Sequence, residues 1–207
     1  MARHTAMCRW PVIVAALAMV FSLASCYVPD KFVAEIRLGG NGDYALTYIG
    51  QLIWAPLFRD IRLNKVAAAD IPVKIEEISR DMVRDPGFKQ VESLGDGRFK
   101  VRYEHEGRLK PSDLYAFVRR NSIILELHAS PDGKVAIDGR TLKPSDAVEA
   151  TTMGLSVTGE FRVITDGKVI EHNATRVVSR GPYLLYIWTI DNVFSPSPHL
   201  VMMRKGG

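Results

Sequence analysis

Apolar and polar residues alternate along several stretches of this chain, and each stretch ends in a turn signal. The alternation runs through residues 32–38, resumes in residues 44–50 and recurs in residues 98–103. A period of two is typical of half-buried antiparallel strands. Glycine-containing turns between such strands favour positive φ angles and predict hairpins. They occur at Gly39–Asp43, Asp96–Gly97, Pro131–Gly133 and Asp166–Gly167.

Helical spacing separates these strands. Ile75, Ile78 and Met82 share one helical face, and Pro86 ends that helix. Further helices are predicted over Pro56–Asn64, over Leu114–Arg120 with Ser112–Asp113 as its cap, and as a short turn from Pro144. Hairpins that alternate with helices, without β-α-β spacing, predict an α+β fold: a mainly antiparallel sheet built from hairpins, with two to four short helices.

The first 25 residues have the pattern of a secretory signal. Arg3 and Arg9 precede an apolar run over residues 10–21, which is shorter than the roughly 20 residues that span a bilayer. The run leads into Leu23, Ala24, Ser25 and Cys26, which resemble the lipobox of bacterial lipoproteins. The resemblance implies that the signal peptide 1–25 is cleaved between Ser25 and Cys26. Cys26 would then carry a diacylglyceryl group on its thiol and an acyl chain such as palmitate on its amino group.

This N-terminus also predicts a location. A lipidated tether over residues 26–31 would join a membrane to a single periplasmic domain over residues 32–207. Tyr27 stands where an Asp would resemble an inner-membrane retention signal, so the outer membrane is favoured if the organism has one. The alternatives are an uncleaved membrane anchor and a cleavage that leaves Cys26 free. No second apolar segment of membrane length is expected in the chain.

Composition excludes several classes of function. Without Arg3 and Arg9, the mature chain has 25 basic and 23 acidic residues. This balance does not predict the concentrated basic surface that nucleic-acid binding needs. Of the two cysteines, only Cys26 survives processing, so neither an internal disulfide nor a thiolate metal cluster can form. We therefore expect no metal and no cofactor.

No catalytic motif is evident. The four histidines of the mature chain have no i, i+2 or i, i+4 pairing, so surface or sheet positions are expected for them; they are His105, His128, His172 and His199. Gly40, Gly42 and Ala45 match the dinucleotide-binding spacing, but a strand follows where that motif needs a helix. The sequence thus predicts a non-enzymatic protein, although a carboxylate or histidine site assembled by folding stays open.

Two segments invite a functional interpretation. Arg98, Lys100 and Arg102 put three positive charges on one strand face, which suits either solvent or anionic lipid headgroups. Residues 183–190 are apolar on both strand faces. They form either a central strand buried on both sides or a strand with one face on a lipid-sized cavity. In the second case the candidate ligand-facing residues are Leu184, Tyr186 and Trp188, opposite Leu185 and Ile187.

A family resemblance follows from the order of the motifs. The lipobox, the hairpin over residues 34–48, the block over residues 159–174 and Tyr186–Trp188 together resemble the LppM-like lipoproteins of mycobacteria and related bacterial envelope lipoproteins. These motifs cover about a third of the chain. The resemblance implies an α+β envelope domain with lipid or glycolipid binding. Unlike that group, this sequence shows no C-terminal transmembrane segment and ends at Met202–Gly207.

The leading hypothesis is therefore a lipid-anchored envelope lipoprotein that binds a lipid or glycolipid ligand, or a protein partner. The first alternative is a structural or assembly-accessory lipoprotein without a ligand. The second is a periplasmic hydrolase. An apolar cavity would favour the leading hypothesis. A solid core would favour the ligand-free structural lipoprotein, and histidine and carboxylate groups that converge in a cleft would favour the hydrolase.

Overall fold

A computed structural model describes residues 27–119, 122–140 and 142–205. Its first strands are β1 (Tyr27–Leu38), β2 (Asp43–Trp54), β3 (Phe88–Gly95), β4 (Arg98–Arg108), β5 (Leu114–Arg119) and β6 (Ser122–Ala129). The later strands are β7 (Lys134–Gly139), β8 (Gly159–Thr165), β9 (Lys168–His172), β10 (Arg176–Arg180), β11 (Tyr183–Ile190) and β12 (His199–Met203). The helices are α1 (Ala55–Arg62), α2 (Ile71–Val83) and α3 (Pro144–Thr152).

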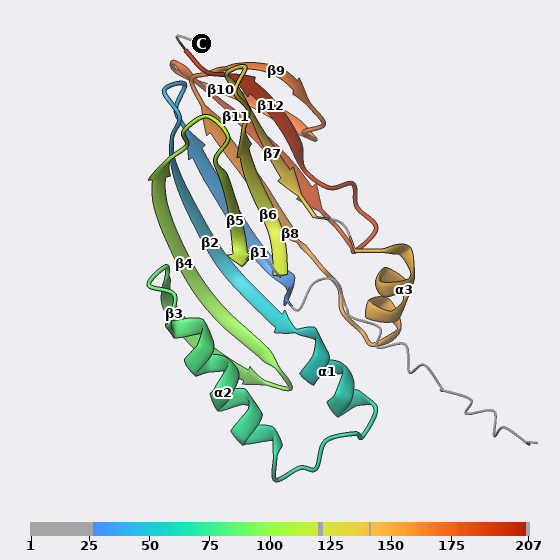
Figure 1. Cartoon of the computed structure of the whole chain (residues 1–207). Coiled ribbons are helices and arrows are strands. Elements are labelled where there is room, and N and C mark those ends of the chain that lie inside the picture. The colour runs from blue at the N-terminus through green and yellow to red at the C-terminus, as the bar shows by residue number, and fades with distance from the viewer. Residues whose placement is uncertain (1–26, 120–121, 141, 206–207) are drawn as a thin grey trace, which may run out of the picture.

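The strands form two sheets, and the predicted α+β class with mainly antiparallel pairing is confirmed. The larger sheet has the order β10-β11-β8-β1-β2-β4-β3, and the smaller one the order β5-β6-β7-β12-β9. Neighbouring strands are antiparallel except for β1 and β8, which are parallel. Figure 1 shows the larger, curved sheet behind the smaller one, with the helices gathered towards one end.

The main core lies between the sheets. The predicted alternation in β1 puts Ala34, Ile36 and Leu38 in the core, and the alternation in β4 does the same for Phe99, Val101 and Tyr103. Such a two-layer arrangement buries the apolar face of each sheet against the other. Helix α2 packs on this core through Ile75, Ile78 and Met82, as its periodicity predicts.

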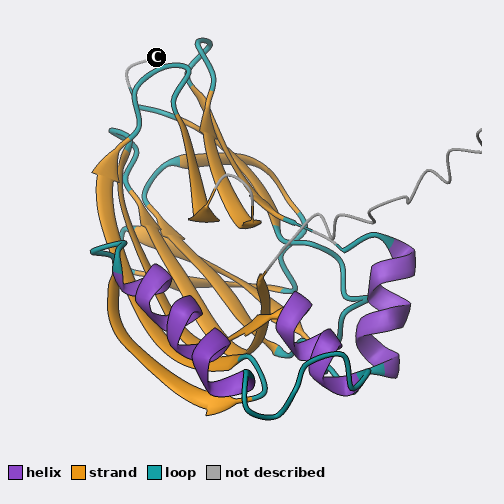
Figure 2. Cartoon of the chain, turned by 60° about the horizontal axis from the view of Figure 1, so that its bottom comes forward, coloured by secondary structure: helices purple, strands orange, loops and turns teal. Residues whose placement is uncertain are grey.

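A second, smaller core closes one end of the sheets. Val28 and Ile53, a cross-strand pair of β1 and β2, pack there with Phe58 of α1 and with Ala147 and Ala150 of α3. Figure 2 turns this end forward and shows all three helices on it. Both α1 and α3 have a proline within their first two residues, Pro56 and Pro144, and the fixed φ angle of proline suits the first turn of a helix. The start of β1 is therefore enclosed by the helical end of the molecule.

Three local predictions are wrong. Residues Leu114–Arg119 form strand β5, paired with β6, and not a helix capped by Ser112–Asp113. Residues 27–31 are part of β1, where Tyr27 and Val28 are buried, so they are not a tether. Asp166–Gly167 joins β8 of the larger sheet to β9 of the smaller one, and so does not close a hairpin.

Within the described ranges, no helix has the length and apolar character needed to cross a membrane.

Candidate functional site

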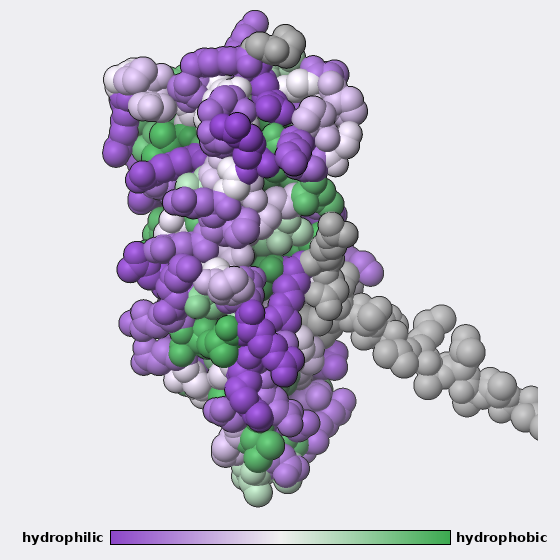
Figure 3. Space-filling view, turned by 60° about the vertical axis from the view of Figure 1, so that its left-hand side comes forward, coloured by the Kyte–Doolittle hydropathy of each residue, from purple (hydrophilic) through white to green (hydrophobic). Residues whose placement is uncertain are grey.

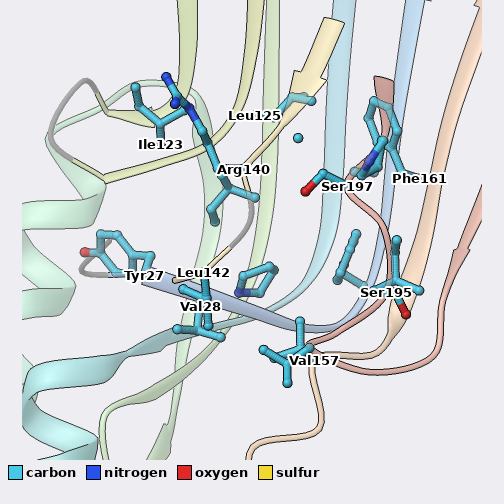
Figure 4. A pocket seen from close by; sticks show the side chains of 18 of the residues that line it. Tyr27, Val28, Ile123, Leu125, Arg140, Leu142, Val157, Phe161, Ser195 and Ser197 are labelled. Atoms are coloured by element: carbon cyan, nitrogen blue, oxygen red, sulfur yellow. The ribbon is translucent and has the colours of Figure 1, made fainter. Parts of the chain in front are cut away.

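An apolar pocket lies between the two sheets at the helical end. It holds about 110 Å³ of space, is partly open to solvent, and is lined mainly by carbon atoms. Figure 4 shows side chains from both sheets and from the loops before β8 and β12 around it. Its wall includes Tyr27, Val28, Phe32, Ala34, Tyr48, Phe117, Ile123, Leu125, Arg140, Leu142, Val157, Phe161, Ile190 and Val193.

The first residues of β1 form one side of this pocket because a β-bulge changes the register there. The bulge lies between Asp30 and Val33, and Lys31 adopts a φ of 47°. The buried Asp30 carboxylate accepts hydrogen bonds from the backbone N–H of Thr158 at 3.0 Å and from its hydroxyl at 3.3 Å. These bonds hold the start of β1 against the loop before β8, which also contributes Val157 to the wall.

Phe32 sits in a space that two glycines leave open. Its ring stacks on Tyr48 at 5.6 Å between centroids. A Cβ atom on Gly50 would lie 2.6 Å from the Phe32 Cα, and one on Gly159 would lie 2.5 Å from the Phe32 ring. Larger residues at 50 or 159 would therefore displace Phe32 and the pocket wall. The bulge and these glycines together explain the position of the wall.

The polar groups of the pocket are few. The Tyr48 hydroxyl donates to the Gln51 carbonyl at 2.7 Å, and burial raises the pKa of Tyr48 well above its ordinary value, so the phenol stays neutral. The charged group of the lining is Arg140, whose guanidinium donates to Glu126 at 2.8 Å and is half exposed. An apolar interior with one ion pair beside it suits a hydrophobic group attached to a polar one.

The predicted ligand-facing residues lie elsewhere on β11. Tyr186 and Trp188 are buried in the main core, and the Trp188 indole N–H donates to the Asn173 side-chain oxygen at 2.6 Å. Leu184 is 39% exposed. The pocket lining takes Ile190 from this strand and includes none of the three. The lipidation and cleavage residues, Leu23, Ala24, Ser25 and Cys26, lie outside the described residues.

The basic face of β4 belongs to a balanced charge pattern. Arg102 is paired with Glu104 at 2.5 Å and Arg98 with Asp96 at 3.3 Å. Both pairs are substantially exposed, so they stabilise the fold little. These ion pairs agree with a solvated strand face better than with a surface for anionic headgroups.

One histidine is part of a polar cluster. The Nδ1 atom of His199 lies 2.6 Å from Asp138, and its Nε2 atom lies 3.5 Å from Glu171. A nucleophile-base pair would need Nε2 to face a hydroxyl or thiol. Here it faces a carboxylate, so the cluster links β7, β12 and β9 and does not form a catalytic triad. No group of residues in the described ranges is arranged to hold a metal ion.

The other histidines lie apart from one another. His105 stacks on Tyr115 at 4.6 Å and His172 lies edge-on to Tyr186 at 4.9 Å. His128 is exposed on β6. These placements agree with the expected sheet and surface positions.

Local sequence patterns missed the pocket because its wall combines seven separate segments of the chain. The apolar wall residues on the strands read as ordinary core by their periodicity, and only the pairing of β1 with β8 brings Phe32 next to the residues before β8. The one local sign of this wall in the sequence is at Asp30–Lys31, where the alternation of apolar and polar residues breaks and the bulge lies.

The fold and pocket define an α+β domain of two facing sheets with an apolar site between them. No protein-family model matches the chain, and no curated protein sequence matches it. Among solved structures, the chain is similar to the NMR structure of the folded domain of LppM from Mycobacterium tuberculosis. The TM-score is 0.44 and the identity 10%, over 90% of this chain and 95% of that one. A similarity of this degree establishes neither a shared family nor a shared function.

Proposed function

We propose that this chain is a non-enzymatic lipoprotein of the bacterial envelope, acylated at Cys26, whose inter-sheet pocket holds part of a lipid acyl chain. The observation that carries the proposal is the position of the pocket. Tyr27 and Val28, which directly follow the lipobox cysteine, are part of its wall. The domain then faces the periplasm, and Tyr27 in place of Asp favours the outer membrane where the organism has one.

The volume of the pocket limits what enters it. Ligand pockets commonly measure about 300–1,000 Å³, whereas a dry cavity of about 150 Å³ holds one benzene. A space of about 110 Å³ therefore admits a short run of methylene groups and leaves a lipid headgroup outside. At about 0.8 kcal/mol per buried methylene, four of them contribute about 3 kcal/mol. Arg140, which lines the pocket and donates to Glu126, would offer its other N–H groups to an anionic or sugar headgroup.

A structural or assembly-accessory lipoprotein without a ligand is the second candidate. The small pocket volume favours it, as does the unbroken burial of Leu185–Trp188. The two candidates differ in one property, which is the capacity of the pocket to take up an acyl chain.

A matched pair of variants separates them. Ala34→Leu adds carbon atoms on the pocket side of β1, whereas Val33→Leu adds one on the outer side of the same strand. We expect Ala34→Leu to weaken the binding of a fluorescent fatty acid at least tenfold and Val33→Leu to leave the binding unchanged. Equal binding by wild type and both variants, or no binding by wild type, would favour the ligand-free role.

The anchor has its own test. Cys26→Ala should abolish metabolic labelling with an acyl-chain analogue and leave the precursor uncleaved, because lipidation normally precedes cleavage. A Cys26→Ala protein of mature length that still fractionates with membranes would contradict acylation at this residue.

A further inference from the structure

The site of acylation and the folded domain have no spacer between them. Tyr27 is 2% exposed, its backbone N–H donates to the Ser122 hydroxyl at 2.9 Å, and its ring contacts Trp54 at 4.8 Å. Adjacent Cα atoms are about 3.8 Å apart. If Cys26 carries the anchor, the surface around Tyr27 must therefore lie against the membrane.

That surface is the helical end of the molecule. Trp54, the strand partner of Tyr27, is the residue directly before α1, and Val28 packs with α1 and α3. The segment that joins α1 to α2 extends from the same end, as Figures 1 and 2 show. The orientation of the domain is thus fixed by where β1 begins.

The segment Leu63–Val73 at this end is apolar although it is exposed. Eight of its eleven residues are apolar, in the sequence LNKVAAADIPV, and Leu63 and Val73 are 52% and 57% exposed. On α3, Val148 is 57% exposed. Figure 3 shows hydrophobic side chains at the lower tip of the molecule, where this segment lies. Most of the other exposed apolar side chains are spread over the strands, whereas Leu63, Val73 and Val148 lie on the helices and on the segment that joins α1 to α2, at the end where β1 begins. Exposed apolar groups at this end are available to a partner surface.

The basic residues of this region lie on α1 and on the segment that follows it. Residues 55–74 contain Arg59, Arg62, Lys65 and Lys74 against Asp60 and Asp70, a net charge of +2, whereas α3 adds Asp146 and Glu149 and no basic residue. Basic residues close to a bilayer with anionic lipids are attracted to its surface potential. The opposite end includes the polar turns Gly39–Asp43 and Pro131–Gly133 (Figure 1).

We infer that the helical end is a membrane-contact surface, with the Leu63–Val73 segment and α3 resting in the headgroup region of the bilayer. This inference rests on the proposed acylation of Cys26. Amphipathic surfaces of this kind enter the interface by about 5–10 Å. The pocket wall formed by Tyr27 and Val28 then lies beside the bilayer, so an acyl chain can pass into the pocket without crossing water.

Single-cysteine labelling tests the orientation. Cys26 is the one cysteine left after signal removal, and acylation blocks it, so a new cysteine is the free thiol of the mature protein. Leu63→Cys and Val148→Cys report on the helical end, and Asp132→Cys is the control in the β6–β7 turn. Ser122, which accepts the hydrogen bond from Tyr27, is the first residue of β6, and Asp132 lies beyond the other end of that strand. At about 3.3 Å per strand residue, Asp132 is roughly 25 Å from Ser122.

The acylated full-length protein, labelled with an environment-sensitive fluorophore, is reconstituted into vesicles of phosphatidylethanolamine and phosphatidylglycerol that contain a lipid-attached quencher. We expect quenching at 63 and 148 to exceed quenching at 132 at least threefold. If labels at 63 and 148 stay as water-exposed as the one at 132 in an acylated protein, the contact surface is refuted and the anchor is not. If acyl labelling shows that the protein carries no lipid, the proposed function and this inference fall together.

Discussion

Two adjacent leucines of β11 allow the packing of this strand to be tested with one substitution. Leu184 and Leu185 point to opposite faces of the larger sheet, and they are 39% and 4% exposed. Leu185 pairs with Val178 and Ile164 on the neighbouring strands. Truncating a buried leucine to alanine costs about 2–5 kcal/mol, because contacts are lost and a void remains. We expect a loss of about 3 kcal/mol in the free energy of unfolding for Leu185→Ala and less than about 1.5 kcal/mol for Leu184→Ala.

Urea denaturation measures both losses. With an m value of about 2 kcal/mol per molar urea, a loss of 3 kcal/mol lowers the midpoint by about 1.5 M. As a control, the m value of each variant should equal that of the wild type, which shows that unfolding exposes the same amount of surface. A strand with one face on a cavity, which is one of the two cases that the sequence left open, would give losses that alternate along residues 184–188. The burial of Leu185, Tyr186, Ile187 and Trp188 predicts four large losses in a row. Equal losses at 184 and 185, or a mild loss at Tyr186 or Trp188, would refute this account of the strand.

Two further predictions concern the pocket wall and the polar cluster. Gly50→Ala should lower stability by about 1–3 kcal/mol, since its Cβ would press on the Phe32 backbone, and unchanged thermal unfolding would contradict that contact. The hydrogen bond that the His199 imidazole donates to the Asp138 carboxylate raises the pKa of His199 above its ordinary value of 6.5. The protonated imidazole therefore stabilises the fold fully below pH 6.5, and this stability is lost as the pH rises through the raised pKa. Asp138→Asn should remove this decrease of the melting temperature with rising pH. An unchanged dependence of the melting temperature on pH would exclude a stabilising role for the His199–Asp138 pair.

Local patterns were sufficient for much of the fold. The predicted helix through Met82 is α2, the one from Pro56 is α1, and the turn at Pro144 extends into α3. Strands with one face in the core showed a clear period of two, because their other face is solvated.

The failures have a common physical cause, which is pairing between distant segments. Leu114, Phe117 and Val118 have the i, i+3, i+4 spacing of a helix, but Phe117 and Val118 are buried through the pairing of β5 with β6. The polar stretch at Asp30–Lys31 resembled a tether, yet Asp30 is buried and bonded to a residue 128 positions away. Turn chemistry at Asp166–Gly167 cannot show that the next strand joins the other sheet.

The sequence allowed the kind of site, an apolar cavity, to be predicted, but not its position. An apolar cavity was one of two outcomes expected from residues 183–190, but the pocket lies at the end of that strand and takes Ile190 from it. The positions of Phe32 and Ala34 on the wall depend on a bulge and on the β1–β8 pairing, which no local pattern reveals.

Native mass spectrometry of the intact lipoprotein, released gently from membranes, tests the central claim most directly. The account predicts a protein that carries covalent lipid at Cys26 and, in addition, a non-covalently bound lipid that is retained at low collision energy. Ala34→Leu should keep the covalent lipid and lose the bound one, and Val33→Leu should keep both. A wild-type protein with the covalent lipid and no bound lipid would contradict a ligand-holding pocket.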